Sequence, residues 1–381
     1  MKKRLSILGS TGSIGVNALD VVFHLKDKFE ICYLSANSNI NLLMKQVIKF
    51  KPKAVAVVDK VGAQSVKGQL DSMGIELLEG RNGLLDLSQR DDIDIMLNAL
   101  VGSYGMEPTL NAIRGGVNVA LANKESLVMA GDLINKFLEH SKAKLFPVDS
   151  EHSAIWQCLI GEDVKEVNRI ILTGSGGPFR LRELSTFKNI KVEEALNHPN
   201  WDMGKKISVD SATMMNKGLE VIEAFWLFGF NHKKIDIVVH PQSIIHSMIE
   251  MNDGSIKAQM GIPDMKVPIQ YALTYPNHMA APWERLDFFQ CGDLTFEKPD
   301  FQRFPSILHA FKSLERGGTS GAALNLSNDM TVDLFLKNKI QFTDIIRINE
   351  VILDAHPWIA HPSLEDLNEL DTWIKNKILE L

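Results

Sequence analysis

Two carboxylates separated by one residue, Asp149 and Glu151, follow a short apolar run at residues 145–148. In an extended chain, the i, i+2 spacing points both side chains to the same side. Carboxylates held together in this way repel each other, which favours a cation between them. Because the ligands would be hard oxygens without cysteine or paired histidine, the pair favours Mg²⁺ or Mn²⁺ over zinc. The alternative is a pair of surface carboxylates, or a cap for a helix expected at 153–159.

A second polar stretch, residues 208–220, precedes an almost continuously apolar run at 221–228. Four of its residues recur at i, i+3, i+4 and i+7, which is one face of a helix: Thr213, Asn216, Lys217 and Glu220. If this face met solvent, it would need no ligand. The apolar run must be buried, however, and polar groups on a buried helix need partners. A phosphate bound by Ser211, Asn216 and Lys217, and a metal ion bound by Glu220, would supply them.

Glycines with the spacing GxxGxxG, at residues 9–15, follow an apolar run and begin a helical pattern. Such a loop allows a tight turn and lets the backbone approach a pyrophosphate, which the helix N-terminus then stabilises. A plain tight turn is the alternative. NAD sites usually carry an acid about 20 residues on to bind the ribose 2′-hydroxyl. Asn37, Ser38 and Asn39 occupy that place without a carboxylate, which favours NADP, although no Arg or Lys stands there either.

Two further loops contain groups that could contact a ligand. The glycines and hydroxyls of residues 173–178 can form a second anion cradle, and a flexible loop fits the same pattern. Residues 198–204 place the imidazole of His198 and the indole of Trp201 on a loop that contains Pro199 and ends at Gly204. That loop is either a lid that excludes water during hydride transfer or a simple surface turn.

The first 150 residues alternate β-rich runs with helical patterns, which predicts βαβ units and a mostly parallel sheet. The expected strands are 4–8, 30–35, 54–58, 93–99, 117–122 and 144–148. Ligands of such sheets bind outside the carboxyl ends of the strands. The first glycine loop, Asn37 to Asn39, and the Asp149–Glu151 pair all fall at those ends, so we expect them to share one edge.

After residue 151 the pattern changes to α+β and then to helices alone. Strands are expected at 170–173, 235–239, 244–250 and 255–259, the last two joined by an Asn-Asp-Gly turn. Helices are expected at 153–159 and 213–228, and apolar residues recur at helical spacing from 307 onward. The fold class is therefore α/β, with a Rossmann-like domain at 1–150, a catalytic domain at 151–280, a connector at 281–305 and a helical domain at 306–381.

Composition excludes several classes of protein. The 381 residues are 45% hydrophobic with a formal net charge of −6, which argues against a disordered chain and against DNA or RNA as the main partner. Cys32, Cys158 and Cys291 are too few and too scattered for a disulfide framework or a zinc cluster. We find no apolar stretch suited to a signal peptide or to a membrane span of roughly 20 residues. A cytoplasmic protein without membrane association is expected.

Eight motifs carry a resemblance to a known family. They are GSTGSIG at 9–15, LANKESLV at 121–128, PVDSEHSAIWQ at 147–157, GSGGPFR at 174–180, HPNWDMG at 198–204, KISVDSATMMNKGLEVIEA at 206–224, HPQSIIHSM at 240–248 and GIPDM at 261–265. Through them the chain resembles, over essentially its whole length, 1-deoxy-D-xylulose 5-phosphate reductoisomerase of the non-mevalonate isoprenoid pathway. The resemblance implies that NADPH and Mg²⁺ or Mn²⁺ serve to isomerise and reduce this phosphorylated sugar to 2-C-methyl-D-erythritol 4-phosphate. It also implies a homodimer.

The resemblance further assigns roles residue by residue. The metal ligands are Asp149, Glu151 and Glu220, which with Lys124 form the catalytic set. Contacts to the hydroxyl and carbonyl end of the substrate come from Lys124, Ser150 and Glu151, and the phosphate contacts from Ser175, His198, Ser211, Asn216 and Lys217. Cofactor contacts are Thr11, Gly12, Ser13, Ile14, Asn37, Ser38, Asn39, Asn123, Glu125 and Gly204. Trp201, beside the substrate, and Met203 lie on what resembles a mobile lid.

One departure from the family pattern bears on the cofactor. Many members carry Gly-Lys-Asn or a similar basic motif where this chain has Asn37, Ser38 and Asn39. Without a cation, capture of the 2′-phosphate weakens, so we expect softer discrimination of NADPH over NADH. Asn37 and Ser38 still donate hydrogen bonds, and NADPH remains the expected cofactor.

Two rival functions remain from the residues themselves. A metal-independent NAD(P)-dependent reductase of another aldehyde would explain the first glycine loop but leave the carboxylates without a role. A non-catalytic protein that senses NADP(H) would need neither the carboxylates nor a polar stripe on a buried helix. A chelator should stop a metal enzyme but leave the metal-independent reductase active. Substitution of Glu220 should leave the cofactor binding and function of a sensing protein intact.

Overall fold

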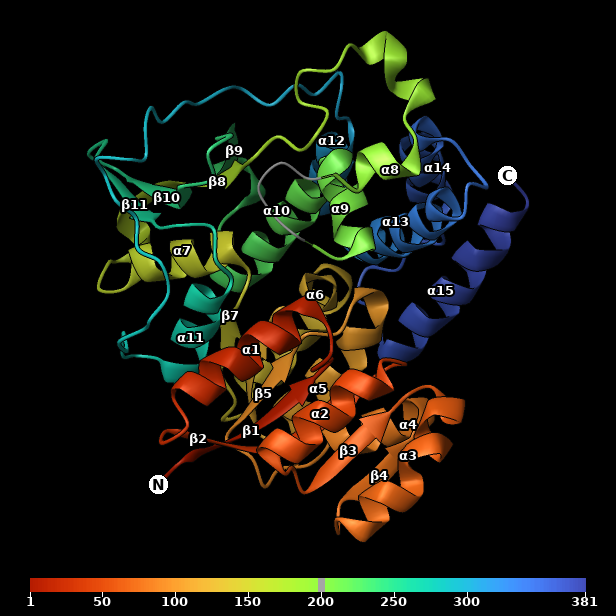
Figure 1. Cartoon of the computed structure of the whole chain (residues 1–381). Helices are drawn as coiled ribbons and strands as arrows, with labels where there is room; N and C mark the ends of the chain where they lie inside the picture. Colours follow the sequence, from red (N-terminus) through yellow and green to blue (C-terminus); the bar gives the residue numbers. More distant parts are fainter. Residues whose placement is uncertain (198–202) are drawn as a thin grey trace. The chain divides into compact units, whose positions relative to one another are not determined.

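The computed structural model describes residues 1–197 and 203–381, and the chain divides into two units (Figure 1). Unit 1 consists of Met1–Ser126, Ile134–Ser153 and Asp264–Trp283. Unit 2 consists of Leu127–Leu133, Ala154–Pro263 and Glu284–Leu381. Helices α6 (Lys124–Glu139) and α7 (Ser150–Leu159) have residues in both units. The division into three functional domains and a connector stays a prediction.

Unit 1 is built on a parallel sheet of seven strands in the order β4-β3-β2-β1-β5-β6-β7. The strands are β1 (Lys3–Leu8), β2 (Phe29–Ala36), β3 (Ala54–Val57), β4 (Glu76–Glu79), β5 (Ile95–Asn98), β6 (Asn118–Leu121) and β7 (Leu145–Pro147). The strand order reverses at β1, between β2 on one side and β5 on the other. This is the switch point at which open parallel sheets bind their ligands.

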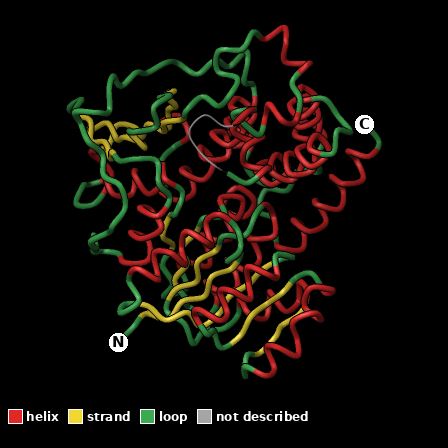
Figure 2. The backbone as a smooth tube through the Cα atoms, in the orientation of Figure 1, coloured by secondary structure: helices red, strands yellow, loops and turns green. Residues whose placement is uncertain are grey.

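Helices lie on both sides of this sheet (Figures 1 and 2). They are α1 (Ser13–His24), α2 (Ile40–Phe50), α3 (Lys60–Ser72), α4 (Gly80–Ser88), α5 (Met106–Arg114) and α11 (Lys266–Thr274), with parts of α6 and α7. Because helices cover both faces of the sheet, the sequences of its central strands are largely apolar. All four residues of β3 are 0% exposed.

The expected parallel α/β sheet is confirmed, with one strand more than the sequence analysis predicted. Strand β4 (Glu76–Glu79) was missed because its sequence, ELLE, lacks β-branched residues and half of it is acidic. It lies at the edge of the sheet, where no strand covers its outer side. An edge strand packs less apolar surface than a central one, so its sequence carries a weaker pattern.

A second difference concerns the segment Asp264–Trp283, which the sequence analysis places mostly in the catalytic domain. In the structure it returns to unit 1. Helix α11 packs on α1, and Lys3 Nζ donates to the backbone oxygen of Leu273 at 3.1 Å. The α1 side of unit 1 is therefore completed by residues far along the chain.

Unit 2 contains a mixed sheet of four strands in the order β11-β10-β8-β9. The strands are β8 (Val167–Gly174), β9 (Ile235–Val239), β10 (Ile245–Met251) and β11 (Ile256–Met260). The antiparallel β10–β11 hairpin confirms the one predicted from the Asn-Asp-Gly turn, where Gly254 takes a φ of +86°. Strand β10 alternates buried and half-buried residues along its whole length, as expected for a sheet with one packed face.

The other helices of unit 2 include the four that follow residue 305, which confirms the helical end of the chain. They are α8 (Val192–Ala195), α9 (Lys205–Ala212), α10 (Met215–Phe228), α12 (Ser306–Arg316), α13 (Ser320–Leu336), α14 (Phe342–Ala355) and α15 (Leu364–Leu379). Five buried phenylalanines form the centre of one core cluster there, with Phe342 in edge-on contact with three of the others: Phe179, Phe187, Phe304, Phe335 and Phe342.

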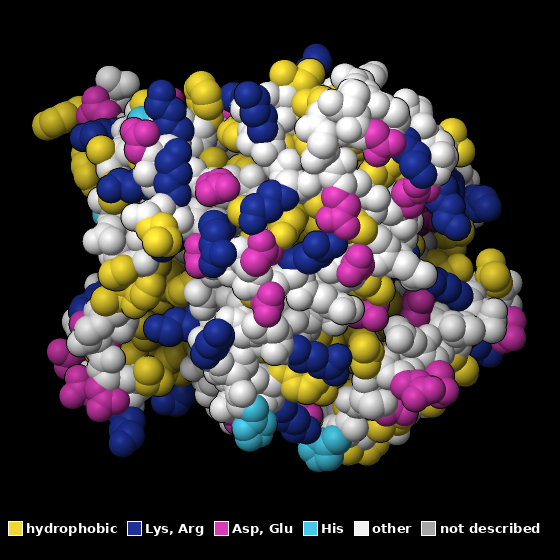
Figure 3. Space-filling model, turned by 90° about the horizontal axis from the view of Figure 1, so that it is seen from below, with side chains coloured by type: hydrophobic (Ala, Val, Ile, Leu, Met, Phe, Trp, Pro, Cys, Tyr) yellow, Lys and Arg dark blue, Asp and Glu magenta, His cyan; other side chains and the backbone are white. Residues whose placement is uncertain are grey.

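The surface mixes charges of both signs. Figure 3 shows Lys and Arg side chains interspersed with Asp and Glu over one face of the molecule, with apolar side chains scattered among them. Among the described residues, no helix combines the length and the apolar character that crossing a membrane requires.

Candidate active site

The first glycine loop connects β1 to α1 at the switch point of the unit 1 sheet. Gly9 has a φ of +79°, and its backbone N donates to Ser35 Oγ at 2.9 Å, which ties the loop to β2. A Cβ at position 9 would lie 2.6 Å from the backbone oxygen of Ala99. Only glycine fits there, because both the left-handed backbone and the neighbouring chain exclude a side chain. The loop therefore has the side-chain-free backbone that lets a pyrophosphate approach closely.

Replacing Gly9 with alanine is expected to destabilise unit 1 and to weaken NADPH binding. The left-handed conformation costs a non-glycine residue about 1–2 kcal/mol, and the contact with Ala99 adds backbone strain. Gly68→Ala is the matched control, because Gly68 lies within helix α3 and nothing stands within 4 Å of its added Cβ. That change should stabilise the helix by up to about 1 kcal/mol. Thermal unfolding and NADPH titration of both variants check the prediction. Equal changes of melting temperature and NADPH affinity in Gly9→Ala and Gly68→Ala would contradict it.

The two polar segments predicted to contact the cofactor follow adjacent strands. Thr11 to Ile14 follow β1, and Asn37 to Asn39 follow β2, so both lie at the carboxyl edge of the sheet. Asn37, Ser38 and Asn39 are exposed. Asn39 also caps α2 by accepting from the backbone N of Leu42 at 3.3 Å. The expectation that these segments share one edge is confirmed, whereas their contacts with a cofactor stay a prediction.

Asn123 caps helix α6 and holds the loop that follows β5. Its Oδ1 accepts from the backbone N of Ser126 at 3.1 Å, and its Nδ2 lies within 3.0 Å of the backbone oxygens of Leu100 and Gly102. Glu125 Oε2 accepts from the same Nδ2 at 3.0 Å. Because Nδ2 carries only two hydrogens, this side chain is fully engaged inside the protein. Asn123 thus shapes the switch-point loop in addition to its predicted role at the cofactor.

The backbone around the first carboxylate pair differs from the extended chain assumed in the sequence analysis. Helix α7 begins at Ser150, three residues earlier than expected, so Glu151 lies in its first turn and Asp149 directly precedes it. The argument from an extended i, i+2 spacing was therefore wrong. Carboxylate oxygens of Asp149 and Glu151 nevertheless lie within 4.8 Å of each other. The positive end of the helix dipole favours negative charge at this position.

Lys124 of α6 forms an ion pair with Asp149, and both side chains are largely buried, at 7% and 12% exposure. Burial alone would raise the pKa of Asp149, but the Lys124 ammonium and the neighbouring His152 hold it well below its usual range. Asp149 is therefore ionised at neutral pH. Ser150 Oγ donates to Glu151 Oε2 at 2.5 Å. Lys124, Asp149, Ser150 and Glu151, all predicted site residues, are thus brought together in unit 1.

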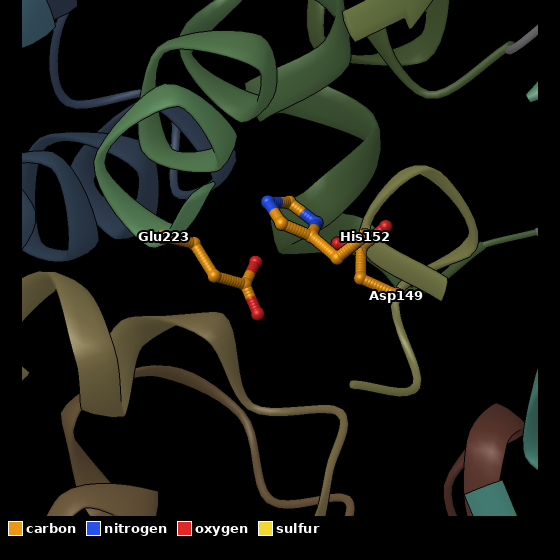
Figure 4. A group of neighbouring side chains, drawn as sticks. All are labelled: Asp149, His152 and Glu223. Atoms are coloured by element: carbon orange, nitrogen blue, oxygen red, sulfur yellow. The ribbon is translucent and has the colours of Figure 1, made fainter. Parts of the chain in front are cut away.

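The sequence analysis missed two buried titratable residues on the helices that carry the predicted ligands. His152 is 0% exposed in the first turn of α7, and Glu223 is 0% exposed on α10, one turn after Glu220. Figure 4 shows His152 beside Asp149 at the start of α7, and the carboxylate of Glu223 extending from its own helix. The available signal for His152 was its place next to Glu151 in the DSEHS sequence. For Glu223 it was the i+3 spacing from Glu220.

The second glycine loop lies in unit 2 against the polar end of α10. A Cβ on Gly174 would lie 2.8 Å from Lys217 Cε, so the stem of Lys217 lies directly on this loop. Gly177 has a φ of +69°, and a Cβ there would lie 2.4 Å from the backbone oxygen of Ser211. Ser175 lies between these two contact points. The structure therefore gathers Ser175, Ser211 and Lys217 in one place, as expected of an anion-binding set.

The polar stripe on the buried helix is confirmed for three of its four residues. Thr213 lies outside it, because it caps the preceding helix α9, which the sequence analysis did not predict, and α10 begins only at Met215. Lys217 and Glu220 are 4% and 1% exposed. Glu220 accepts from both Asn216 Nδ2 and Lys217 Nζ. The buried polar groups thus satisfy one another within the protein.

The residues of the predicted lid are described only in part. Gly204 is exposed and caps the N-terminus of α9, and Met203, half-buried, precedes it. His198 and Trp201, predicted to contact the substrate, lie outside the described residues.

Comparison with known proteins covers nearly the whole chain. Three domains of one family match in order: 1-deoxy-D-xylulose 5-phosphate reductoisomerase at residues 5–131, its C-terminal domain at 145–228, and the DXP reductoisomerase C-terminal domain at 260–377. Curated relatives named 1-deoxy-D-xylulose 5-phosphate reductoisomerase include one from Chloroherpeton thalassium, 49% identical over 99% of this chain and 98% of its own. Another, from Ruminiclostridium cellulolyticum, is 49% identical over the full length of both chains.

Solved structures agree with this relationship. A DOX-P reductoisomerase in complex with NADPH, fosmidomycin and magnesium superposes with a TM-score of 0.95 at 36% identity, covering 99% of this chain and 98% of its own. The reductoisomerase from Zymomonas mobilis in complex with NADPH superposes with a TM-score of 0.92 at 42% identity and the same coverage. The chain belongs to the 1-deoxy-D-xylulose 5-phosphate reductoisomerase family.

Proposed function

We propose that this protein converts 1-deoxy-D-xylulose 5-phosphate to 2-C-methyl-D-erythritol 4-phosphate, using NADPH and a divalent cation, in isoprenoid biosynthesis. The observation that carries the proposal is the match to family members over the whole chain at up to 49% identity. The reaction rearranges the carbon skeleton of the sugar and reduces the resulting aldehyde with hydride from the nicotinamide. It therefore needs a dinucleotide site, a charged group that polarises substrate oxygens, and a phosphate site.

The dinucleotide site is the carboxyl edge of the unit 1 sheet. The backbone of the Gly9 loop and the N-terminus of α1 bind the pyrophosphate, while Asn37, Ser38 and Asn39 stand at the adenosine ribose. We assign the remaining cofactor contacts to Asn123, Glu125 and Gly204. The related reductoisomerase from Zymomonas mobilis was solved in complex with NADPH.

The metal ligands are the carboxylates of Asp149, Glu151 and Glu220. A donor set made only of carboxylates suits Mg²⁺ or Mn²⁺, and Asp149 and Glu151 already bring their oxygens within 4.8 Å of each other. When bound, the ion acts as a Lewis acid on the hydroxyl and carbonyl oxygens of the substrate. Lys124 holds Asp149 ionised, and with Ser150 it orients that end of the substrate.

The phosphate of the substrate binds Ser175, Ser211, Asn216 and Lys217 in unit 2, together with His198. Lys217→Ala is expected to raise KM for 1-deoxy-D-xylulose 5-phosphate by roughly tenfold to a hundredfold, because a charge-assisted hydrogen bond is worth about 1.5–3 kcal/mol. Steady-state kinetics check the split, since kcat should fall much less. Lys205→Ala, an exposed lysine on α9, serves as the control. A change confined to kcat would contradict the assigned role.

NADPH oxidation with 1-deoxy-D-xylulose 5-phosphate, measured with Mg²⁺, with Mn²⁺ and with excess EDTA, tests the function. Turnover that EDTA stops and either metal restores is the expected result. Turnover indifferent to EDTA would instead favour a metal-independent reductase. Bound NADPH without turnover under any metal would favour a sensing protein.

The cofactor preference is open to a direct test at position 38. Ser38→Lys is expected to tighten NADPH binding at low ionic strength by about 1 kcal/mol, because an exposed ammonium near the 2′-phosphate gains a screened attraction. NADH, which lacks that phosphate, provides the internal control. Fluorescence titrations of both cofactors at low and high salt measure the effect. Equal gains for NADH and NADPH would show that position 38 does not face the 2′-phosphate.

We further propose that the protein is a cytoplasmic homodimer, from its family membership. Light scattering coupled to gel filtration measures the oligomeric state, and a monomer at micromolar concentration would overturn that assignment.

A further inference from the structure

Buried polar side chains connect α9, α13 and α14 of unit 2. Asp210 on α9 is 1% exposed, and its two carboxylate oxygens have different partners. Oδ2 lies 2.9 Å from Lys206 Nζ, one turn earlier on the same helix. Oδ1 accepts from Asn328 Nδ2 of α13 at 2.7 Å. A carboxylate removed from water is costly unless it is both charge-paired and hydrogen-bonded, so these two contacts hold Asp210 in place.

The amides beyond Asp210 form a relay with one allowed orientation. A carboxylate only accepts, so Asn328 turns its NH₂ group toward Asp210 and accepts at Oδ1 from Asn349 Nδ2 at 3.2 Å. Asn349 Oδ1 then accepts from Thr331 Oγ1 at 3.1 Å. Asn328, Asn349 and Thr331 are all 0% exposed. Because flipping either amide would set two donors or two acceptors against each other, the charge of Asp210 fixes the hydrogen-bond direction across three helices.

Lys206 makes a second connection between α9 and α13. Its Nζ lies 3.1 Å from Asp329 Oδ1, in addition to its contact with Asp210. The Lys206 side chain is 15% exposed and the Asp329 side chain 22% exposed. Helix α9 thus makes two neighbouring polar contacts with α13. One is the hydrogen bond from the Asn328 amide to the Asp210 carboxylate, and the other is the ion pair of Lys206 with Asp329.

The position of α9 determines the geometry of the predicted phosphate site. Ser211 directly follows Asp210 on this helix. The backbone oxygen of Ser211 approaches Gly177 so closely that a Cβ would lie 2.4 Å away. The loop that carries Ser175 therefore rests on the end of α9, and a shift of the helix would move both serines.

We propose that Asp210 is a positioning residue for the phosphate end of the substrate. Through Asn328 and Asn349, helices α13 and α14 fix α9, and with it Ser211 and the loop of Ser175. The inference rests on the proposed function, because it takes these serines as phosphate ligands. Disturbing the relay should raise KM for the phosphorylated substrate far more than it weakens NADPH binding, because among the assigned cofactor contacts Gly204 alone caps α9 and the others lie in unit 1.

The decisive experiment exchanges the charged and the neutral member of the pair. In Asp210→Asn the neutral amide loses its charge pairing with Lys206, and with its oxygen held by that ammonium its NH₂ group faces the NH₂ group of Asn328. The relay can then close only if Asn328 and Asn349 both turn over, with Thr331 Oγ1 donating to the backbone oxygen of Ser327 instead. We expect KM to rise by about tenfold or more, with kcat changed by less than about threefold. In the double variant Asp210→Asn/Asn328→Asp, every hydrogen bond of the relay can form again with the roles exchanged. KM should return to within about threefold of the wild-type value.

Controls separate positioning from general loosening of the helical region. Leu367→Ala removes a side chain that is 1% exposed on α15, outside the relay, and should lower the melting temperature without raising KM. Should Asp210→Asn fail to fold, Asn349→Ala keeps the Asp210–Lys206 pair and should raise KM by about threefold. A double variant as impaired as the single one, or an equal rise of KM in Leu367→Ala, would overturn the proposal.

A measurement without turnover distinguishes this inference from the function itself. Inorganic phosphate should raise the melting temperature of the wild-type protein, and Asp210→Asn should need about tenfold more phosphate for the same shift. If the wild type responds to phosphate but does not convert 1-deoxy-D-xylulose 5-phosphate, the proposed function fails while the positioning role stands. Equal phosphate dependence in both proteins would refute the role of Asp210.

Discussion

Replacing Glu220 with glutamine is expected to lower kcat by about a thousandfold or more, with the protein still folded and able to bind NADPH. The amide keeps the volume of a side chain that is 1% exposed but removes the negative charge that a divalent cation requires. Lewis-acid activation is worth several kcal/mol, and about 4 kcal/mol corresponds to a thousandfold in rate. Lys217 Nζ can still donate to the amide oxygen, so the local fold should survive.

Measurements of kcat, thermal unfolding and NADPH titration together test this expectation. Glu223→Gln is the matched control, because Glu223 lies one turn further on the same helix and is 0% exposed. It should retain most of the activity, since the metal site is assigned to Glu220. Near-normal turnover in Glu220→Gln would remove Glu220 from the metal site. Loss of activity in Glu223→Gln alone would assign that role to Glu223.

Asp149→Asn should abolish turnover to a similar degree and should also destabilise the protein. The carboxylate of Asp149 pairs with Lys124, whose side chain is only 7% exposed. An asparagine oxygen still accepts a hydrogen bond from that ammonium but carries no charge, so we expect a loss on the order of 2 kcal/mol. Urea unfolding measures the stability, and turnover over a range of Mg²⁺ concentrations measures the metal dependence.

A double-mutant cycle with Lys124→Met separates the ion pair from other consequences of the change. If the pair is coupled, the sum of the stability losses in the two single variants exceeds the loss in the double variant. A coupling energy near zero would show that Lys124 and Asp149 do not stabilise each other. Activity retained in Asp149→Asn would remove Asp149 from the ligand set.

Much of the fold could be predicted because the central strands of the unit 1 sheet are buried on both faces. Runs such as Ala54–Val57 are continuously apolar, and their spacing between helical patterns indicates a parallel sheet. Strand β4 escaped prediction because its exposed edge position selects few apolar residues. Helix α9 escaped for a related reason: Ser208 and Asp210 are polar yet buried, and Asp210 is hydrogen-bonded by Asn328 of α13, more than a hundred residues away in the sequence.

Residues of the candidate site were easier to propose than their geometry. Motif and residue type nominated Asp149, Glu151, Lys217 and Glu220, but local sequence could not show that α7 begins at Ser150. Nor could it show which polar groups bond to one another, as Glu220 does with Lys217. Such contacts depend on the packing of elements distant in the sequence, which periodicity does not contain.

A ribosome making this chain completes residues 1–153 well before it completes unit 1. The 110 residues from 154 to 263 must be synthesised before the segment Asp264–Trp283 emerges, which takes roughly 5–20 s at bacterial or slower elongation rates. During this delay the side of α1 that packs on α11 lacks its partner, and Lys3 and His24 lack their contacts with Leu273 and Ala280. We therefore expect a fragment cut at residue 153 to aggregate rather than fold alone.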